Sequence, residues 1–184
     1  MKSGFIAIVG RPNVGKSTLM NKLIKEKVAI VSDKAGTTRD QIKGIINIGE
    51  NQYIFMDTPG IHKPKHLLGE HMTNVALDTL NNADLILFML DGTQGISTGD
   101  MFVNENAKNS NTPIVLIINK IDKMTDEDIA LKLEEVKEKL GEFAGIITMT
   151  GEYGIGVHKI FEISEKYLSN DMWFYPEDYY TDLP

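Results

Sequence analysis

A glycine-rich run that ends in lysine and serine is the first part of this chain whose residue types and spacing could do chemistry. Residues 10–17 read Gly-Arg-Pro-Asn-Val-Gly-Lys-Ser and fit the pattern G-x-x-x-x-G-K-[ST]. Gly10 and Gly15 allow the backbone to turn so that its N–H groups point inward at phosphate oxygens. The Lys16 ammonium could then reach the β- and γ-phosphates of a nucleotide, and the Ser17 hydroxyl could ligate Mg²⁺. The candidate phosphate-binding residues are Gly10, Asn13, Val14, Gly15, Lys16, Ser17 and Thr18.

Two further segments could complete a metal and phosphate site. In the run Asp57-Thr58-Pro59-Gly60, Asp57 could hold Mg²⁺ through a water molecule, and the Gly60 N–H could meet the γ-phosphate. Residues 61–72 are polar and irregular, and we expect a mobile lobe there. In residues 35–40, a threonine hydroxyl could join the metal while the γ-phosphate is present and let go after hydrolysis. Each segment alone is better explained as a plain turn or loop, so both assignments depend on the glycine-rich run.

The run Asn119-Lys120-Ile121-Asp122 has the chemistry to recognise a guanine base. The Asp122 carboxylate only accepts hydrogen bonds, and guanine presents N1–H and the 2-amino group as two adjacent donors. Adenine has no such pair, so it would leave the carboxylate without partners. Asn119 could bond guanine N7 and brace the phosphate loop, and the Lys120 stem could lie along the base. Alone, the run could be a solvated turn; with the other two runs it indicates a guanine-nucleotide switch.

The elements that must position these residues alternate along the chain. Continuous apolar runs predict buried strands, and spaced apolar residues predict helices between them. The expected strands are 5–9, 41–48, 52–56, 84–90, 114–118 and 146–149, and the expected helices are 17–25, 73–80, 125–140 and 157–168. The second and third strands flank a hairpin-like turn at 49–51 and should be antiparallel. The pattern predicts an α/β fold with a mainly parallel sheet, whose ligands bind beyond the carboxyl ends of the strands. All three runs lie at such ends.

Composition excludes several classes of function. The 184 residues carry a formal net charge of −7, which argues against a general nucleic-acid binder, DNA included. The chain has no cysteine, so it has neither disulfides nor thiolate metal sites. The longest apolar run is too short to span a membrane, and residues 5–9 are too short for the core of a signal peptide. We expect one cytoplasmic domain with a substantial core.

Several other features suggest structure rather than chemistry. We expect solvated histidines at 62, 66 and 71, and core packing for Met89 and Met149. The helix at 125–140 has a capping-box pattern at Thr125 and Asp128, and an apolar stripe formed by Ile129, Leu133, Val136 and Leu140. Its charged face should be exposed: Lys132, Glu134, Glu135, Lys137, Glu138 and Lys139. The aromatic tail at 169–184 either packs over the domain or leads into a further part.

These motifs resemble those of the Era family of bacterial GTPases, within the larger group that includes the GTPase domains of tRNA-modifying MnmE-type proteins. The first to fourth G motifs correspond to residues 10–17, 37–40, 57–60 and 119–122. Similarity specific to Era occurs at 60–65 with 68–69, and at 175–178 with 181–182. The resemblance covers essentially the whole chain.

The resemblance implies a P-loop NTPase G domain, with a mostly parallel six-stranded sheet, one antiparallel strand and helices on both faces. It implies a Mg²⁺-dependent GTPase of slow intrinsic turnover that converts GTP to GDP and phosphate. Its implied metal ligands are Ser17, Thr38 and Asp57, and Thr38 is preferred to Thr37 on the family pattern alone. Its implied catalytic residues are Asn13, Lys16, Thr38 and Gly60. Its implied nucleotide contacts beyond the phosphate loop are Asp57, Gly60, Asn119, Lys120, Asp122, Thr150 and Gly151.

Two positions depart from widespread GTPase patterns. The fifth motif usually reads Ser-Ala, and Thr150-Gly151 stands in its place; the threonine keeps a hydroxyl, and the Gly151 N–H could reach guanine O6. Ile61 stands where Ras-like proteins have a water-orienting glutamine, and it can neither donate nor accept a hydrogen bond. In related proteins an asparagine of the phosphate loop ligates K⁺ in place of an arginine finger. Asn13 occupies that position and predicts K⁺-stimulated hydrolysis.

The resemblance also implies partners. Era proteins continue into a KH-type domain that reads the 3′ end of 16S rRNA, so we expect residues 1–170 to be the G domain and 171–184 a linker towards an absent KH domain. The implied role is a switch in maturation of the small ribosomal subunit, in the cytoplasm and peripherally at the inner face of the membrane. The G domain of an MnmE-type protein is the alternative. A P-loop kinase and a nucleotide-binding module without hydrolysis are rivals from other classes.

Overall fold

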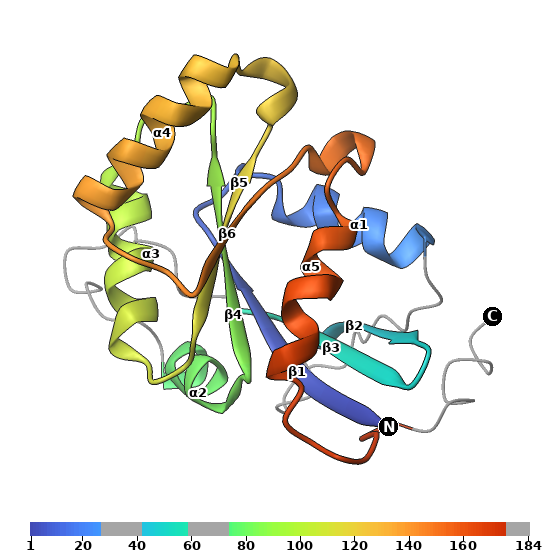
Figure 1. Cartoon of the computed structure of the whole chain (residues 1–184). Coiled ribbons are helices and arrows are strands. Elements are labelled where there is room, and N and C mark those ends of the chain that lie inside the picture. Colours follow the sequence, from blue (N-terminus) through green and yellow to red (C-terminus); the bar gives the residue numbers. More distant parts are fainter. Residues whose placement is uncertain (27–41, 59–73, 176–184) are drawn as a thin grey trace.

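The computed structural model describes residues 1–26, 42–58 and 74–175, and within them the chain forms a six-stranded sheet (Figure 1). The strands are β1 (Lys2–Val9), β2 (Ile42–Ile48), β3 (Asn51–Asp57), β4 (Leu85–Asp91), β5 (Ile114–Asn119) and β6 (Gly145–Thr148). Their order is β2-β3-β1-β4-β5-β6; β2 is antiparallel to β3 and all other neighbours are parallel. The predicted α/β fold is confirmed, including its antiparallel pair.

Helices cover both faces of the sheet (Figure 1). They are α1 (Lys16–Glu26), α2 (Asn74–Asn82), α3 (Thr98–Asn109), α4 (Asp126–Lys139) and α5 (His158–Ser164), with single 3₁₀ turns η2 (Ile121–Lys123), η3 (Gly151–Tyr153) and η4 (Glu165–Tyr167). Buried side chains of α2, α3 and α4 pack in one cluster, and those of α1 and α5 pack in a second cluster on the opposite face. Helices therefore cover both faces of the sheet, which is why its central strands are continuous apolar runs in the sequence.

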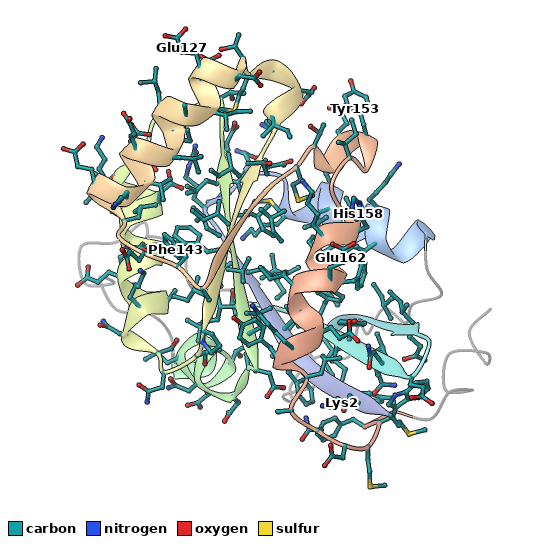
Figure 2. The ribbon with its side chains drawn as sticks, in the orientation of Figure 1. Lys2, Glu127, Phe143, Tyr153, His158 and Glu162 are labelled. Atoms are coloured by element: carbon teal, nitrogen blue, oxygen red, sulfur yellow. The ribbon has the colours of Figure 1, made fainter. Side chains whose placement is uncertain are left out.

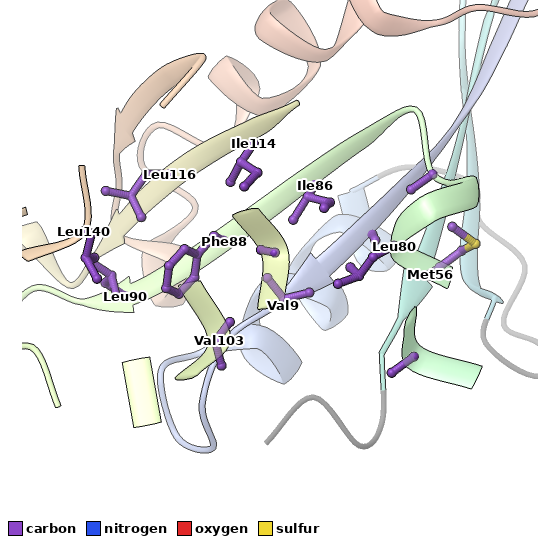
Figure 3. Packing of buried hydrophobic residues seen from close by; sticks show 14 of the residues in the cluster. Val9, Met56, Leu80, Ile86, Phe88, Leu90, Val103, Ile114, Leu116 and Leu140 are labelled. Carbon is purple, nitrogen blue, oxygen red and sulfur yellow. The ribbon is translucent and has the colours of Figure 1, made fainter. Parts of the chain in front are cut away.

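Strand β4 shows how firmly the centre of the sheet is fixed. All seven of its residues are buried, and side chains alternate between the two clusters, with Phe88 on the side of α3. Figure 3 shows the Phe88 ring packed among Val9, Val103 and Leu116. Burying one such large apolar side chain contributes about 1.5–3 kcal/mol to folding. These contacts hold the carboxyl ends of β1, β4 and β5, where the candidate site lies, in fixed relative positions.

Helix α3 is not among the helices expected from the sequence. Its sequence is rich in asparagine and has a weak apolar period, which favours a loop assignment. A capping box starts the helix: the Asp100 N–H donates to Ser97 Oγ, and Asp100 Oδ2 accepts from the Ser97 N–H. Val103 and Ala107 then anchor its inner face in the core. Tertiary burial of two side chains and one good cap therefore outweigh the low helix propensity.

Helix α4 confirms one expectation and corrects two others. The capping box of Thr125 and Asp128 is present. Leu133, expected in the apolar stripe, is 38% exposed, so the buried face is narrower than predicted. Lys132, expected on the exposed charged face, is only 9% exposed; its Nζ donates to the Gln94 carbonyl at 2.6 Å and to Glu135 Oε1 at 2.8 Å. A lysine can be buried when its charge is partnered in this way.

The first residues of the aromatic tail lie near the amino ends of β1 and β3, whereas the candidate site lies at the carboxyl ends of the strands. Gln52, fully buried in β3, accepts from the N–H groups of Phe174 and Tyr175 and donates to the Tyr175 carbonyl. The Phe174 ring lies 4.8 Å from the ring of Phe5, and Trp173 Nε1 donates to the Glu50 carbonyl. Residues 173–175 of the expected linker thus pack on the domain, while the division at residue 170 stays a prediction.

Some sequence-based predictions lie outside the described residues. These are the segments 35–40 and 59–72, including Thr38, Gly60 and Ile61, the histidines at 62, 66 and 71, and the Era-like stretch after Tyr175. In the parts of the chain that the structure describes, no helix has the length and apolar character needed to cross a membrane.

Candidate functional site

The three runs singled out in the sequence meet at the carboxyl edge of the sheet. The glycine-rich loop follows β1, Asp57 ends β3 and Asn119 ends β5. Beside them lies an open cavity of about 820 Å³, a size that suits a nucleotide. Its lining includes the predicted residues Asn13, Gly15, Lys16, Ser17, Thr18, Asp57 and Lys120. The other lining residues were not predicted from the sequence; they are Ile8, Pro12, Met20, Asn21, Lys43 and Met56.

The phosphate loop has a backbone that few residue types could adopt. Asn13 has φ 72° and Gly15 has φ 110°, both in the left-handed region. A β-carbon on Gly15 would lie 2.3 Å from Asn119 Nδ2, so only glycine fits there. Val14 is fully buried in the core below the loop, so its backbone, and not its side chain, is the part that could face a ligand. The loop forms a concave cradle of the kind that holds phosphate.

Lys16 supplies positive charge at the floor of this cradle. Its Nζ donates to the Gly10 carbonyl at 2.7 Å, across the loop. Burial lowers the pKa of Lys16 below its usual value, and the nearby Asp57 carboxylate opposes that shift. The half-buried ammonium is thus only partly compensated by Asp57, and a phosphate group would add counter-charge. The Asp57 carboxylate itself accepts from the Thr58 N–H at 2.9 Å.

Asn119 connects the third run to the phosphate loop. The side chain is buried, and its Nδ2 donates to the Val14 carbonyl at 3.0 Å. Its Oδ1 accepts from the Gly151 N–H at 2.9 Å. One amide thus holds the loop after β1 and the loop after β6 at a fixed separation. The fit of a base between these loops, and each predicted nucleotide contact, stays a prediction.

Asp122 is held in place by the threonine that departs from the usual fifth motif. The Thr150 hydroxyl, which is buried, accepts from the Asp122 N–H at 3.2 Å and donates to Asp122 Oδ1 at 3.3 Å. The hydroxyl that threonine shares with the usual serine therefore forms both hydrogen bonds to Asp122. Asp122 is exposed, and its Oδ2 has no hydrogen bond among the described residues.

Asp91, a residue to which the sequence patterns gave no role, fixes the side chain of Lys120. Asp91 ends β4, between the strands that carry the phosphate loop and Asn119, and its side chain is 1% exposed. Its Oδ2 accepts from Lys120 Nζ at 2.8 Å, and its Oδ1 accepts from the N–H and the hydroxyl of Thr93. A carboxylate at the end of a buried strand, beside two strands that end in candidate residues, is the signal that could have identified it.

We expect Asp91→Asn to reduce the free energy of unfolding by about 2 kcal/mol at pH 7, because a charge-assisted bond to Lys120 is lost. Burial alone would raise the pKa of Asp91, but hydrogen bonds from Lys120 and Thr93 outweigh burial and lower it. A carboxyl group with a lowered folded-state pKa stabilises the fold above the unfolded pKa of about 3.9, and this contribution is lost as pH falls below it. Denaturant unfolding at pH 7 and pH 3.5 should therefore show a smaller difference between the two proteins at the lower pH. An equal difference at both pH values would contradict this assignment.

Comparison with known proteins adds independent findings. A family model described as 50S ribosome-binding GTPase matches residues 5–120. The chain is 57% identical over all of its 184 residues to GTPase Era of Fusobacterium nucleatum, and it spans 62% of the length of that relative.

Two solved structures match the fold closely. One is Era in complex with MgGDPNP and nucleotides 1506–1542 of 16S ribosomal RNA. The other is a variant of Aquifex aeolicus Era bound to GDP and AlF₄⁻. Each is 42% identical with a TM-score of 0.78, and the match covers 97% of this chain and 61% of the other.

Proposed function

The chain belongs to the family of 50S ribosome-binding GTPases and, within it, to the Era proteins, and from this premise we propose that it binds GTP and hydrolyses it to GDP and phosphate. One observation carries the proposal: Asn119 joins the phosphate loop to the loop of Thr150 and Gly151, which in turn orients Asp122. A phosphate cradle and an acceptor-only carboxylate are thereby held in one rigid unit. This arrangement selects a guanine nucleotide over an adenine nucleotide.

Hydrolysis in this site rests on positioning and electrostatics. No described side chain at the cavity stands out as a general base, which is usual for phosphoryl transfer in this class of fold. Lys16 would neutralise charge on the β- and γ-phosphates, and the loop N–H groups would orient them. Mg²⁺, when bound, neutralises phosphate charge, and Ser17 and Asp57, which both line the cavity, have the oxygen donors that suit it. Thr38 and Gly60 would complete the site from segments outside the described residues.

The biological role follows from the Era relatives. The solved Era complex contains 16S rRNA, which belongs to the small ribosomal subunit. We therefore favour a switch in maturation of that subunit over the role of an MnmE-type protein. In this proposal the RNA contact lies in a KH-type domain beyond the part of the relatives that this chain matches. Cytoplasmic location and peripheral contact with the membrane belong to the same proposal, and the Era resemblance is their support.

A pair of measurements tests the proposal against its rivals. Equilibrium titration with fluorescent GTP, GDP and ATP should show binding of the guanine nucleotides only. Single-turnover assays with Mg²⁺ should then release phosphate from GTP without any added acceptor. A nucleotide-binding module would bind and show no release, and a kinase would need a phosphate acceptor. Tight binding of ATP would overturn the assignment of Asp122.

We also propose that hydrolysis is stimulated by K⁺ through Asn13, which lines the cavity in a left-handed conformation. Hydrolysis should be several-fold faster in KCl than in NaCl, because K⁺ would supply charge that an arginine finger supplies elsewhere. The informative variant is Asn13→Gly, since glycine keeps the backbone conformation and removes the amide. It should lose the difference between the two salts while still binding GDP. Equal rates of the wild type in both salts would refute this part of the proposal.

A further inference from the structure

The second residue of the phosphate loop, Arg11, forms its hydrogen bonds outside the cavity, in a polar cluster with the buried Asp100 and the exposed Gln94. It is absent from the cavity lining, although its neighbours Pro12 and Asn13 belong to it. Its Nε donates to Asp100 Oδ1 at 3.1 Å, and its Nη2 donates to Gln94 Oε1 at 2.5 Å. The arginine stem lies against the first turn of α3, where a β-carbon on Gly99 would be 3.7 Å from Arg11 Cδ. Arg11 therefore ties the loop to α3.

The partner of Arg11 is a buried carboxylate, Asp100, whose two oxygens both accept hydrogen bonds. Asp100 is 2% exposed, and its Oδ2 already accepts from the N–H and the hydroxyl of Ser97, which closes the cap of α3. Arg11 supplies both the hydrogen bond to Oδ1 and the opposite charge that a buried carboxylate requires. The contact is therefore built into the fold and is unlike an exposed ion pair, which would contribute little.

The other end of the cluster is fixed by α4. Gln94, which accepts from Arg11 through its side chain, accepts from Lys132 Nζ through its backbone carbonyl at 2.6 Å. Lys132 is also paired with Glu135 at 2.8 Å. The segment between β4 and α3 is thus clamped from two sides. The firm part of the anchor is Asp100, because it is buried and bonded into the cap of α3 independently of Lys132.

The loop needs such an anchor because its backbone is strained. Asn13 holds a left-handed conformation that costs a residue other than glycine free energy, and such conformations persist only where the surroundings impose them. Asn119 restrains the loop from one side, through the Val14 carbonyl, and Arg11 restrains it from the other. We propose that Arg11 is a positioning residue that holds the phosphate loop in its binding conformation before a nucleotide arrives. This inference rests on the proposed function, because the ligand of the loop is the guanine nucleotide.

The test compares Arg11→Met with the double variant Arg11→Met/Asp100→Asn. The double variant removes the unpaired buried charge, and the oxygen of the introduced amide can still accept from Ser97, so it keeps the fold if the single variant does not. Both should bind GTP and GDP about tenfold more weakly, because each nucleotide must now order the loop itself. Turnover at saturating GTP should stay within about twofold, since Arg11 touches no reacting atom. Arg11→Lys, which keeps the charge and loses the two-pronged contact, should fall between.

Lys132→Met is the matched control, since it breaks the far end of the same cluster without touching the loop. It should lower the melting temperature and leave nucleotide affinity unchanged. If Arg11→Met behaved in the same way, the role of Arg11 would be structural only and the inference would be wrong. A loss of turnover beyond about twofold at saturation would also overturn it. Failure of the wild type to bind guanine nucleotides would instead refute the proposed function, so the two failures are distinguishable.

Discussion

Asp122→Asn should change the preferred nucleotide from GTP to xanthosine triphosphate. In the proposed site the carboxylate would accept two hydrogen bonds from guanine, whereas the amide presents one donor and one acceptor, which match the 2-oxo group and N1–H of xanthine. We expect the affinity for GTP to fall by at least about a hundredfold, because a polar group covered by the bound base would be left unpaired. The affinity for xanthosine triphosphate should rise to near the wild-type value for GTP. Competition titrations against a fluorescent nucleotide measure both changes.

The geometry around Asp122 allows this substitution without loss of the contacts that hold residue 122 in place. Thr150 accepts from the backbone N–H of residue 122 and donates to Oδ1, and an asparagine can preserve both contacts. Thr150→Val is therefore a useful companion, since it removes the hydroxyl and leaves the carboxylate in place. It should weaken binding of GTP without creating any preference for xanthine. A variant Asp122→Asn that lost all nucleotides equally would show that residue 122 supports the fold and does not read the base.

Lys16→Met should abolish most of the GTP hydrolysis and leave the folded protein at least as stable as the wild type. Removing one preorganised charge from a phosphoryl-transfer site costs about a hundredfold to a thousandfold in turnover. Burial lowers the pKa of Lys16, which means that the fold disfavours the charged ammonium. The protonated lysine therefore opposes folding, and a methionine relieves this opposition. Single-turnover phosphate release and thermal melting without nucleotide measure the two effects.

Lys22→Met is the matched control for this prediction. Lys22 lies on the same helix, α1, and is half-buried, but it does not line the cavity. The same charge is removed, so any effect of net charge on the nucleotide should appear in both variants. We expect turnover of Lys22→Met to remain close to that of the wild type. A loss of folding stability in Lys16→Met would contradict our account of its buried charge, whatever the effect on hydrolysis.

The burial of Lys132 and the presence of α3 could not be predicted from the sequence. The charged neighbours of Lys132 predict an exposed position on α4, yet Lys132 is buried against a carbonyl of a loop 38 residues away. Periodicity along a helix says nothing about which distant backbone group will face it. In the same way α3 lacks a strong apolar period, and the cap that starts it is stabilised by Arg11, which comes from another part of the chain. Tertiary partners of this kind leave no local pattern.

Aromatic residues near the surface show the same limit (Figure 2). Tyr153 projects from η3 into solvent and is 62% exposed, although tyrosines are often half-buried. By contrast Phe143, close to the start of β6, forms a cation–π contact: Lys108 Nζ lies over its ring, 4.1 Å from the ring centroid. Neither environment follows from the residue type or its spacing.

The order of residues along the chain was enough to predict the sheet, its antiparallel pair and the edge of the sheet at which the cavity lies. Backbone geometry explains why: apolar runs that alternate with helices must form a parallel sheet, and the glycines at 10 and 15 permit a loop that other residues forbid. Only the tertiary structure shows that Asn119 bridges two loops, that Asp91 binds Lys120 and that Arg11 of the phosphate loop binds Asp100. Each of these contacts joins residues that are from 29 to 105 positions apart, and their pairing depends on how the strand ends are brought together.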